Sequence, residues 1–186
     1  MSNGGMMAYR LACEASAHFT SLVSVSGTYM LQRPCTIAKP TNFLHLHGDD
    51  DPTVPWTGGL CCNLSLPGMP GLSVPDSLEH LARQFKCRCS NLTCAQQHRG
   101  QGQEQGGASS GEARGVSKWS FDGCLNGVLL EVCLLPDWKH HWPARIGKIK
   151  SPLQATKFML DWWAGIVKRD KATTALVSNQ GGTAVS

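Results

Sequence analysis

Residues 128–135, with the sequence VLLEVCLL, form the most apolar run of the chain. A short run that is apolar almost throughout is typical of a strand buried on both faces of a sheet. Two other β-rich segments precede it, Ser21 to Ser26 and Asn42 to His47, and a glycine follows each of them. We therefore expect three strands of one sheet.

Helical patterns alternate with these strands. Residues 4–14 place Met7 and Leu11 on one face of a helix. Residues 73–85 begin with a serine that can cap a helix and then carry apolar side chains at helical spacing. Ser151 and Pro152 open a third helical pattern. This alternation predicts the α/β class, with a mostly parallel sheet flanked by helices.

The composition indicates one domain and excludes some partners. The chain has 186 residues and a net charge of +4, and its basic residues are scattered. We expect neither nucleic acid nor membrane as a partner, since no apolar stretch approaches the ~18 residues that span a bilayer. Residues 96–115 (QQHRGQGQEQGGASSGEARG) predict a disordered insertion within a folded domain of residues 1–169, and residues 170–186 predict a flexible tail.

Nine cysteines favour disulfides and an oxidising compartment. Asn63 and Asn91 each begin a glycosylation acceptor triplet, which also requires the secretory route. The opening MSNGGMMAYR lacks the basic end and apolar core of a signal peptide. A missing N-terminal segment would reconcile this opening with secretion.

The cysteine spacing leaves two alternatives. Cys87, Cys89, Cys94 and His98 could bind zinc, but their spacing fits no common site, so we favour disulfides and expect no metal. Because the odd cysteine count leaves at least one cysteine unpaired, not every position can be bridged. Cys124 and Cys133 flank the turn into the apolar run and are predicted to form one bridge.

Four segments follow one another along the chain: MSNGGMMAYRLACE from Met1, HGDDDPTVP from His47, SVPDSLEHLA from Ser73, and GCLNG from Gly123 with the apolar run and HHWP that follow it. In this order they resemble the feruloyl esterase and poly(3-hydroxybutyrate) depolymerase family of α/β-hydrolases. The resemblance runs from Met1 to about residue 164, with interruptions near residues 56–72 and 95–118. It implies a partial α/β-hydrolase fold that lacks its N-terminal strands.

The resemblance also assigns a catalytic triad. Ser2 matches the nucleophile of the G-x-S-x-G motif without its first glycine, Asp51 matches the acid, and His140 matches the base. The backbone N–H of Asn3, the residue after the nucleophile, would stabilise the oxyanion. Asp49 is a weaker alternative for the acid. A different mechanism, in which Met1 is removed and Ser2 uses its own amine as base, is a minor alternative.

Several neighbouring residues are given secondary roles. Trp56 and Trp142 follow the acid and the histidine and are predicted to bind substrate by stacking. His141 is expected to be a neighbour that faces solvent or substrate, and His45 a hydrogen-bonded strand residue. Residues 137–139 (DWK) stand where the family often has glycines.

The resemblance implies a secreted serine esterase that needs no cofactor. Its substrate would be a small or polymeric ester, either a feruloyl or acetyl ester of a polysaccharide or a hydroxyalkanoate polyester. Nothing in the sequence indicates an oligomeric state. The alternative is a truncated product without catalysis, or a secreted binding module. Since the expected N-terminal strands are missing, we expect the chain to be weak or inactive as an enzyme.

Overall fold

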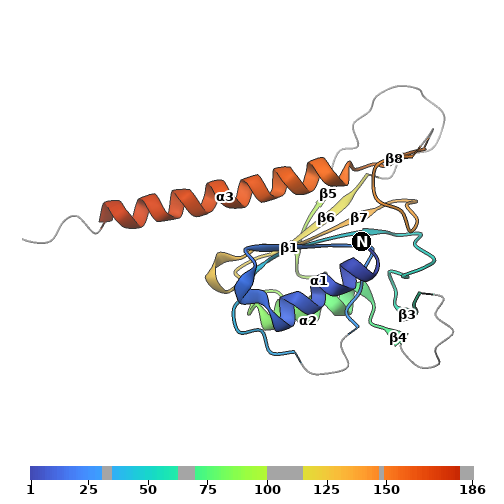
Figure 1. Cartoon of the computed structure of the whole chain (residues 1–186), viewed down its shortest axis with the longest axis horizontal. Coiled ribbons are helices and arrows are strands. Elements are labelled where there is room, and N and C mark those ends of the chain that lie inside the picture. The colour runs from blue at the N-terminus through green and yellow to red at the C-terminus, as the bar shows by residue number, and fades with distance from the viewer. Residues whose placement is uncertain (31–34, 63–69, 100–114, 147–148, 181–186) are drawn as a thin grey trace, which may run out of the picture.

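The computed structural model describes residues 1–30, 35–62, 70–99, 115–146 and 149–180 (Figure 1). Its centre is a five-stranded sheet in the order β1-β2-β7-β6-β5. The strands of this sheet are β1 (Ser21–Val25), β2 (Asn42–Gly48), β5 (Gln96–Arg99), β6 (Ser117–Phe121) and β7 (Leu130–Leu135). Two small ribbons, β3 (Gly59–Leu60) with β4 (Pro70–Gly71) and β8 (Arg145–Ile146) with β9 (Ile149–Lys150), lie outside it.

The helices are α1 (Asn3–Glu14), α2 (Val74–Gln84) and α3 (Ala155–Gln180), with short 3-10 turns at Ser16–His18 and Leu125–Gly127. The three strands expected from the sequence, β1, β2 and β7, pair in parallel. This arrangement confirms the α/β class. The sheet is mixed but mostly parallel, as expected, because β6 runs antiparallel to both of its neighbours while β5 runs in the same direction as β1, β2 and β7.

The helices cover the two faces of the sheet. Figure 1 shows α1 and α2 on one face and α3 on the other. Because side chains alternate along a strand, Phe43 packs in the core beneath α1 and α2, whereas Leu44 and Leu46 pack in the core beneath α3. None of the described helices has the length and the hydropathy that a bilayer span requires.

Two boundary predictions are wrong. The insertion expected over residues 96–115 begins with an ordered strand, because the backbone of Gln96–Arg99 pairs with β6 and an edge strand needs no apolar side chains for that pairing. Residues 100–114 lie outside the described residues. The tail expected from residue 170 is helical as far as Gln180, where two glycines follow. No glycine or proline interrupts residues 170–180, so the helix continues.

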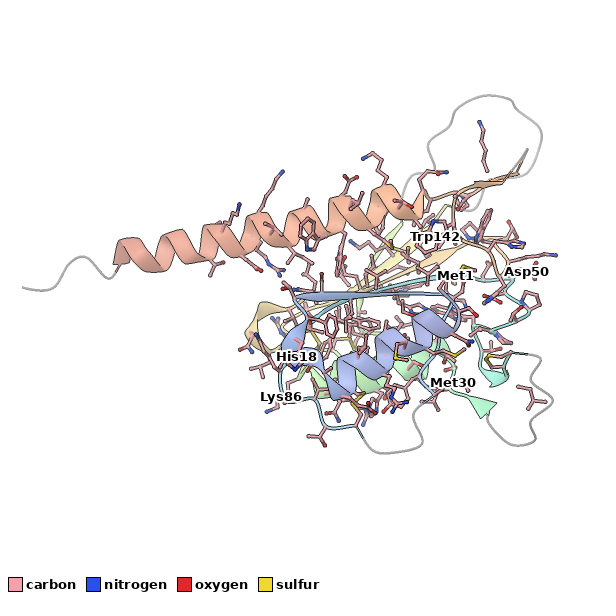
Figure 2. All side chains as sticks on the ribbon, in the orientation of Figure 1. Met1, His18, Met30, Asp50, Lys86 and Trp142 are labelled. Carbon is pink, nitrogen blue, oxygen red and sulfur yellow. A yellow bond between two sulfur atoms is a disulfide. The ribbon has the colours of Figure 1, made fainter. Side chains whose placement is uncertain are left out.

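Four disulfides join eight of the nine cysteines. The pairs are Cys13–Cys35, Cys61–Cys62, Cys87–Cys124 and Cys89–Cys94, and their sulfur atoms are drawn in yellow in Figure 2. The predicted Cys124–Cys133 bridge is wrong. Cys124 packs in the core beneath α2, whereas Cys133 is free and packs in the core beneath α3, on the opposite face of the sheet. Four disulfides are consistent with an extracellular location.

Candidate functional site

The carboxyl ends of β1, β2 and β7 lie side by side. Val25 is opposite Leu46, and Leu46 is opposite Cys133 in the parallel register. The N-terminal segment reaches the same edge, because the N–H of Ser2 donates to the carbonyl oxygen of Val25 at 2.9 Å. The carboxyl edge of a parallel sheet is where α/β proteins bind their ligands.

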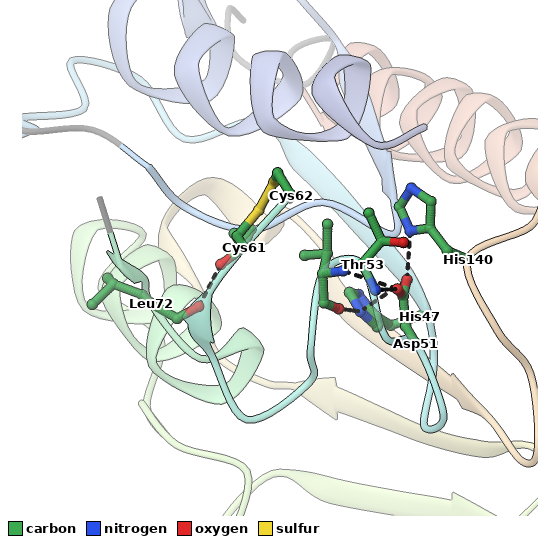
Figure 3. The surroundings of a disulfide bond; sticks show 9 residues. His47, Asp51, Thr53, Cys61, Cys62, Leu72 and His140 are labelled. Atoms are coloured by element: carbon green, nitrogen blue, oxygen red, sulfur yellow. Dashed lines mark hydrogen bonds and ion pairs between the residues drawn. A yellow bond between two sulfur atoms is a disulfide. The ribbon is translucent and has the colours of Figure 1, made fainter. Parts of the chain in front are cut away.

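Asp51 lies in the loop after β2 with both carboxylate oxygens occupied. Its Oδ1 accepts hydrogen bonds from the backbone N–H groups of Thr53 and Val54, both at 2.9 Å. Its Oδ2 lies 2.8 Å from Nδ1 of His140 (Figure 3). The residue is 4% exposed. The two backbone donors orient the carboxylate, so that its second oxygen faces the histidine.

His140 comes from the loop after β7. Because a carboxylate only accepts hydrogen bonds, the contact with Asp51 places the imidazole proton on Nδ1 and leaves the Nε2 lone pair as a base. The side chain of His140 is 17% exposed, so part of the ring is in contact with solvent. His141 is exposed, and its carbonyl oxygen accepts from Nε1 of Trp138. Only the first histidine of the pair therefore meets the acid.

The loops after β2 and β7 are joined directly. The N–H of Asp137 donates to Oδ1 of Asp49 at 2.7 Å, and the N–H of Asp50 donates to the carbonyl oxygen of Trp138 at 3.3 Å. A Cβ atom on Gly48 would lie 1.9 Å from that same carbonyl oxygen. Asp49 thus holds the histidine loop, whereas Asp51 makes the hydrogen bond to His140.

Asp137 forms a tight turn in the loop before His140. Its φ is 53°, a left-handed conformation that aspartate tolerates better than most residues. The turn that a glycine would allow is therefore made without one. Residues 137–139 thus bring His140 within hydrogen-bond distance of Asp51.

Ser2 occupies a strained turn before α1. Its φ is 55° and its ψ is −122°, which is rare for a residue with a side chain. A Cβ on Gly5 would lie 2.8 Å from the carbonyl oxygen of Val25, and one on Gly27 would lie 2.5 Å from the Gly5 backbone. Glycines at these positions let α1 pack closely on the end of β1. Such a strained turn before a closely packed helix is typical of a nucleophile in the G-x-S-x-G motif.

The predicted triad is only partly joined. Asp51 and His140 are hydrogen-bonded, but no hydrogen bond joins Ser2 to His140 among the residues that the structure describes. Ser2 shares their edge of the sheet through Val25. Asn3 is the first residue of α1, so its N–H belongs to the amides that a helix leaves without a partner of its own.

The two predicted substrate-binding tryptophans lie on different sides of the sheet edge. The ring of Trp56 lies 5.8 Å from the ring of His47, in an edge-on contact, and packs against the core beneath α1 and α2. Trp142 packs against the core beneath α3, as Met1 does, and Figure 2 labels both. Both tryptophans are half-buried. Their role in substrate binding stays a prediction.

A disulfide between adjacent cysteines borders the acid loop (Figure 3). Cys61 and Cys62 follow the loop, and the N–H of Cys62 donates to the carbonyl oxygen of Thr53 at 2.8 Å. Thr53 in turn supplies one of the backbone donors to Asp51. The disulfide therefore adds a covalent constraint beside the carboxylate.

Sequence reasoning missed a buried chain of hydrogen bonds beneath the site. The hydroxyl of Tyr9 lies 3.0 Å from Nδ1 of His45, Nε2 of His45 lies 2.9 Å from Nδ1 of His47, and Nε2 of His47 lies 2.8 Å from the carbonyl oxygen of Val54. The prediction of His45 as a hydrogen-bonded strand residue is confirmed. The spacing of two between the histidines was the available signal, because it places both on one face of β2.

Burial changes the acid–base behaviour of these groups. It lowers the pKa of His45 well below the usual value, and the neighbouring His47 lowers it further. Burial also lowers the pKa of His47, against the opposing effects of the Val54 carbonyl and the Asp51 carboxylate. Burial raises the pKa of Tyr9. The folded protein thus favours the neutral form of all three side chains.

The buried hydrogen bonds of Tyr9, His45 and His47 predict that acid lowers the stability of the folded protein. Below about pH 6.5 the unfolded chain protonates both histidines, while the folded protein keeps them neutral down to their lowered pKa values. The free energy of unfolding should therefore fall as the pH drops through this window, by at most about 1.4 kcal/mol per pH unit for each histidine. The titratable groups that face the two rings are Tyr9, Asp51 and His140.

Urea unfolding between pH 7.5 and 5.5 measures this effect. His45→Gln should flatten the pH dependence, because its amide can donate to His47 and accept from Tyr9 without titrating. His141→Gln, at an exposed position, should leave the dependence unchanged. The prediction is wrong if the His45 variant keeps the full slope.

Of the two predicted glycosylation positions, the structure describes one. Asn91 is exposed, and its Oδ1 accepts from the N–H groups of Thr93 and Cys94, while Asn63 lies outside the described residues. A cavity of about 240 Å³ lies at the amino ends of the strands, at the opposite edge of the sheet from Asp51. Within the described residues, no group of three or more histidine, cysteine or carboxylate side chains could hold a metal ion.

Comparison of the sequence with models of protein families and with curated proteins gave no match. The assignment of a function therefore depends on the four sequence segments and on the geometry at the carboxyl edge of the sheet.

Proposed function

We propose that this chain is a serine carboxylic-ester hydrolase that acts through an acyl-enzyme, with Ser2 as nucleophile, His140 as base and Asp51 as the orienting acid. One observation carries the proposal. His140 Nδ1 lies 2.8 Å from Asp51 Oδ2 at the sheet edge to which the strained Ser2 turn is hydrogen-bonded. The acid follows β2 and the histidine follows β7, the neighbouring strand in the sheet. The order along the sequence, with the nucleophile first, then the acid and then the histidine, is that of α/β-hydrolases.

The chemistry follows from these roles. Nε2 of His140 takes the proton of the Ser2 hydroxyl as its oxygen attacks the ester carbonyl. The N–H of Asn3 stabilises the negative oxygen of the tetrahedral intermediate. The imidazolium then gives its proton to the leaving alcohol, and water repeats the sequence on the acyl-enzyme. Asp51 keeps the imidazole in the Nδ1–H tautomer and stabilises its charged form.

The proposed substrate is a feruloyl or acetyl ester of a polysaccharide, or a hydroxyalkanoate polyester. The support is the family resemblance, together with Trp56 and Trp142 on the two sides of the site, whose rings can stack on an aromatic acid or a sugar. We also propose that the protein is secreted, since its four disulfides require an oxidising compartment.

Covalent labelling tests the nucleophile. A fluorophosphonate probe should modify Ser2, detected by mass spectrometry of the N-terminal peptide. The chain should also hydrolyse p-nitrophenyl acetate and methyl ferulate at a low rate. Ser2→Ala should abolish labelling and lower hydrolysis to the uncatalysed rate. The matched control is Ser21→Ala, at the amino end of β1, which should change neither.

Labelling at another residue, or hydrolysis that survives in Ser2→Ala, would overturn the proposal. Absence of both labelling and hydrolysis in the folded chain would also overturn it and would favour a binding module without catalysis.

A further inference from the structure

Three buried side chains form a continuous hydrogen-bonded chain that ends at the acid loop. His45 and His47 lie on one face of β2, and Tyr9 reaches them from α1. The exposed fractions of Tyr9, His45 and His47 are 0%, 0% and 1%. Burying two imidazoles and a phenol is costly unless each polar atom is paired, and here each one is.

Donation along these hydrogen bonds runs in one direction, from Tyr9 to the Val54 carbonyl. The Val54 carbonyl can only accept, so Nε2 of His47 carries the proton and donates to it. Nδ1 of the neutral His47 then accepts from Nε2–H of His45, and Nδ1 of His45 accepts from the hydroxyl of Tyr9. Both imidazoles are therefore neutral and protonated on Nε2. A proton added to His47 would reverse the chain and take away the acceptor of the Tyr9 hydroxyl.

The backbone of Val54 is held through the peptide units on both sides of its Cα atom. The carbonyl of Val54 accepts from His47, while the N–H of Val54 donates to Oδ1 of Asp51. Nε2 of His47 also lies 3.7 Å from Oδ2 of Asp51, the oxygen that contacts His140. A shift of His47 would thus move the acid loop and the oxygen that orients the catalytic histidine.

We propose that His47 is a positioning residue, which fixes the Asp51 carboxylate against His140 through the backbone of Val54 and is itself oriented by His45 and Tyr9. The predicted effect of this role on catalysis rests on the proposed esterase function. The predicted effect on the Asp51–His140 contact is independent of that function. A displacement of about 1 Å at such a contact can lower a rate by about 100-fold.

Two substitutions separate positioning from packing. In His47→Gln, the amide nitrogen can donate to Val54 and the amide oxygen can accept from His45. In His47→Leu, the side chain fills similar space but donates nothing. His141→Gln is the control at an exposed histidine.

The first readout is the NMR signal of the His140 Nδ1 proton. This proton should be far downfield and slow to exchange in the unchanged chain, in His47→Gln and in the control. Its exchange should be at least about 10-fold faster in His47→Leu. The second readout is esterase kcat, which should fall about 10- to 100-fold in His47→Leu with little change in KM, and should recover in His47→Gln.

An unchanged His140 proton signal in folded His47→Leu would overturn the proposal. If that variant does not fold, ¹⁵N NMR of the unchanged chain decides, because the proposal requires neutral His45 and His47 protonated on Nε2, and any other tautomer contradicts it. If Ser2 is not labelled but the His140 proton responds to His47 as stated, the positioning role stands and only the esterase function fails.

Discussion

Replacing Asp51 with asparagine should lower kcat/KM for p-nitrophenyl acetate by up to about 10,000-fold, which in a weakly active chain means a fall to the uncatalysed rate. The amide can donate to Nδ1 of His140 and hold the imidazole in the tautomer that blocks Nε2 as a base. The backbone donors of Thr53 and Val54 can still bond to the amide oxygen, so the loop should keep its shape. Circular dichroism and the urea midpoint should confirm that the fold is retained.

The neighbouring carboxylate supplies a matched control. Asp50 is exposed and lies 3.8 Å from the ammonium group of Lys139, and exposed ion pairs of this kind contribute little. Asp50→Asn should therefore retain nearly full activity. Similar losses in the two variants would show that charge near the edge, rather than the Asp51–His140 contact, governs the rate.

Removing the Cys87–Cys124 disulfide should cause the largest loss of stability. This bridge ties the end of α2 to the turn before β7 and closes a loop with a sequence separation of 37. The loop-entropy relation gives about 4 kcal/mol for its removal, against about 2 kcal/mol for Cys89–Cys94, whose separation is 5. Each pair would be replaced by serines and the free energy of unfolding measured in urea.

The two variants control for one another, because both remove one disulfide near the end of α2. A loss for Cys89–Cys94 that equals or exceeds the loss for Cys87–Cys124 would contradict the prediction. It would show that local packing around residues 87–94, rather than loop closure, determines the stabilisation.

The sequence predicts those elements whose side chains carry a strong pattern. Ser73 illustrates this, because its hydroxyl accepts from the N–H of Asp76 and begins α2 where the pattern places it. The strand Gln96–Arg99 was missed, since its polar residues carry no β pattern and its order comes from backbone pairing with β6. The bridge to Cys124 was assigned to the wrong partner, because spacing does not show which face of a strand a cysteine occupies.

The candidate site also contains contacts that the sequence predicts and contacts that it does not. The contact between Asp51 and His140 was predictable from the order of the motifs, since each follows a strand and parallel strands end at one edge. The link through His47 and Tyr9 was not predictable, because it depends on which face of β2 meets α1. The turn at Asp137 was also beyond sequence reasoning, since its φ is 53° and its N–H bonds to Asp49, which is 88 residues away in the sequence.

The single free thiol has a consequence for how the protein matures. Burial raises the pKa of Cys133 to about 12, and the thiolate is the species that attacks in disulfide exchange. Once β7 has paired with β2 and β6, Cys133 is thus withdrawn from exchange, and the eight cysteines that remain still allow about 105 pairings. A chain that forms its sheet before it oxidises never has to release a bridge made with Cys133, whereas a chain that oxidises first must break every such bridge before β7 can be buried.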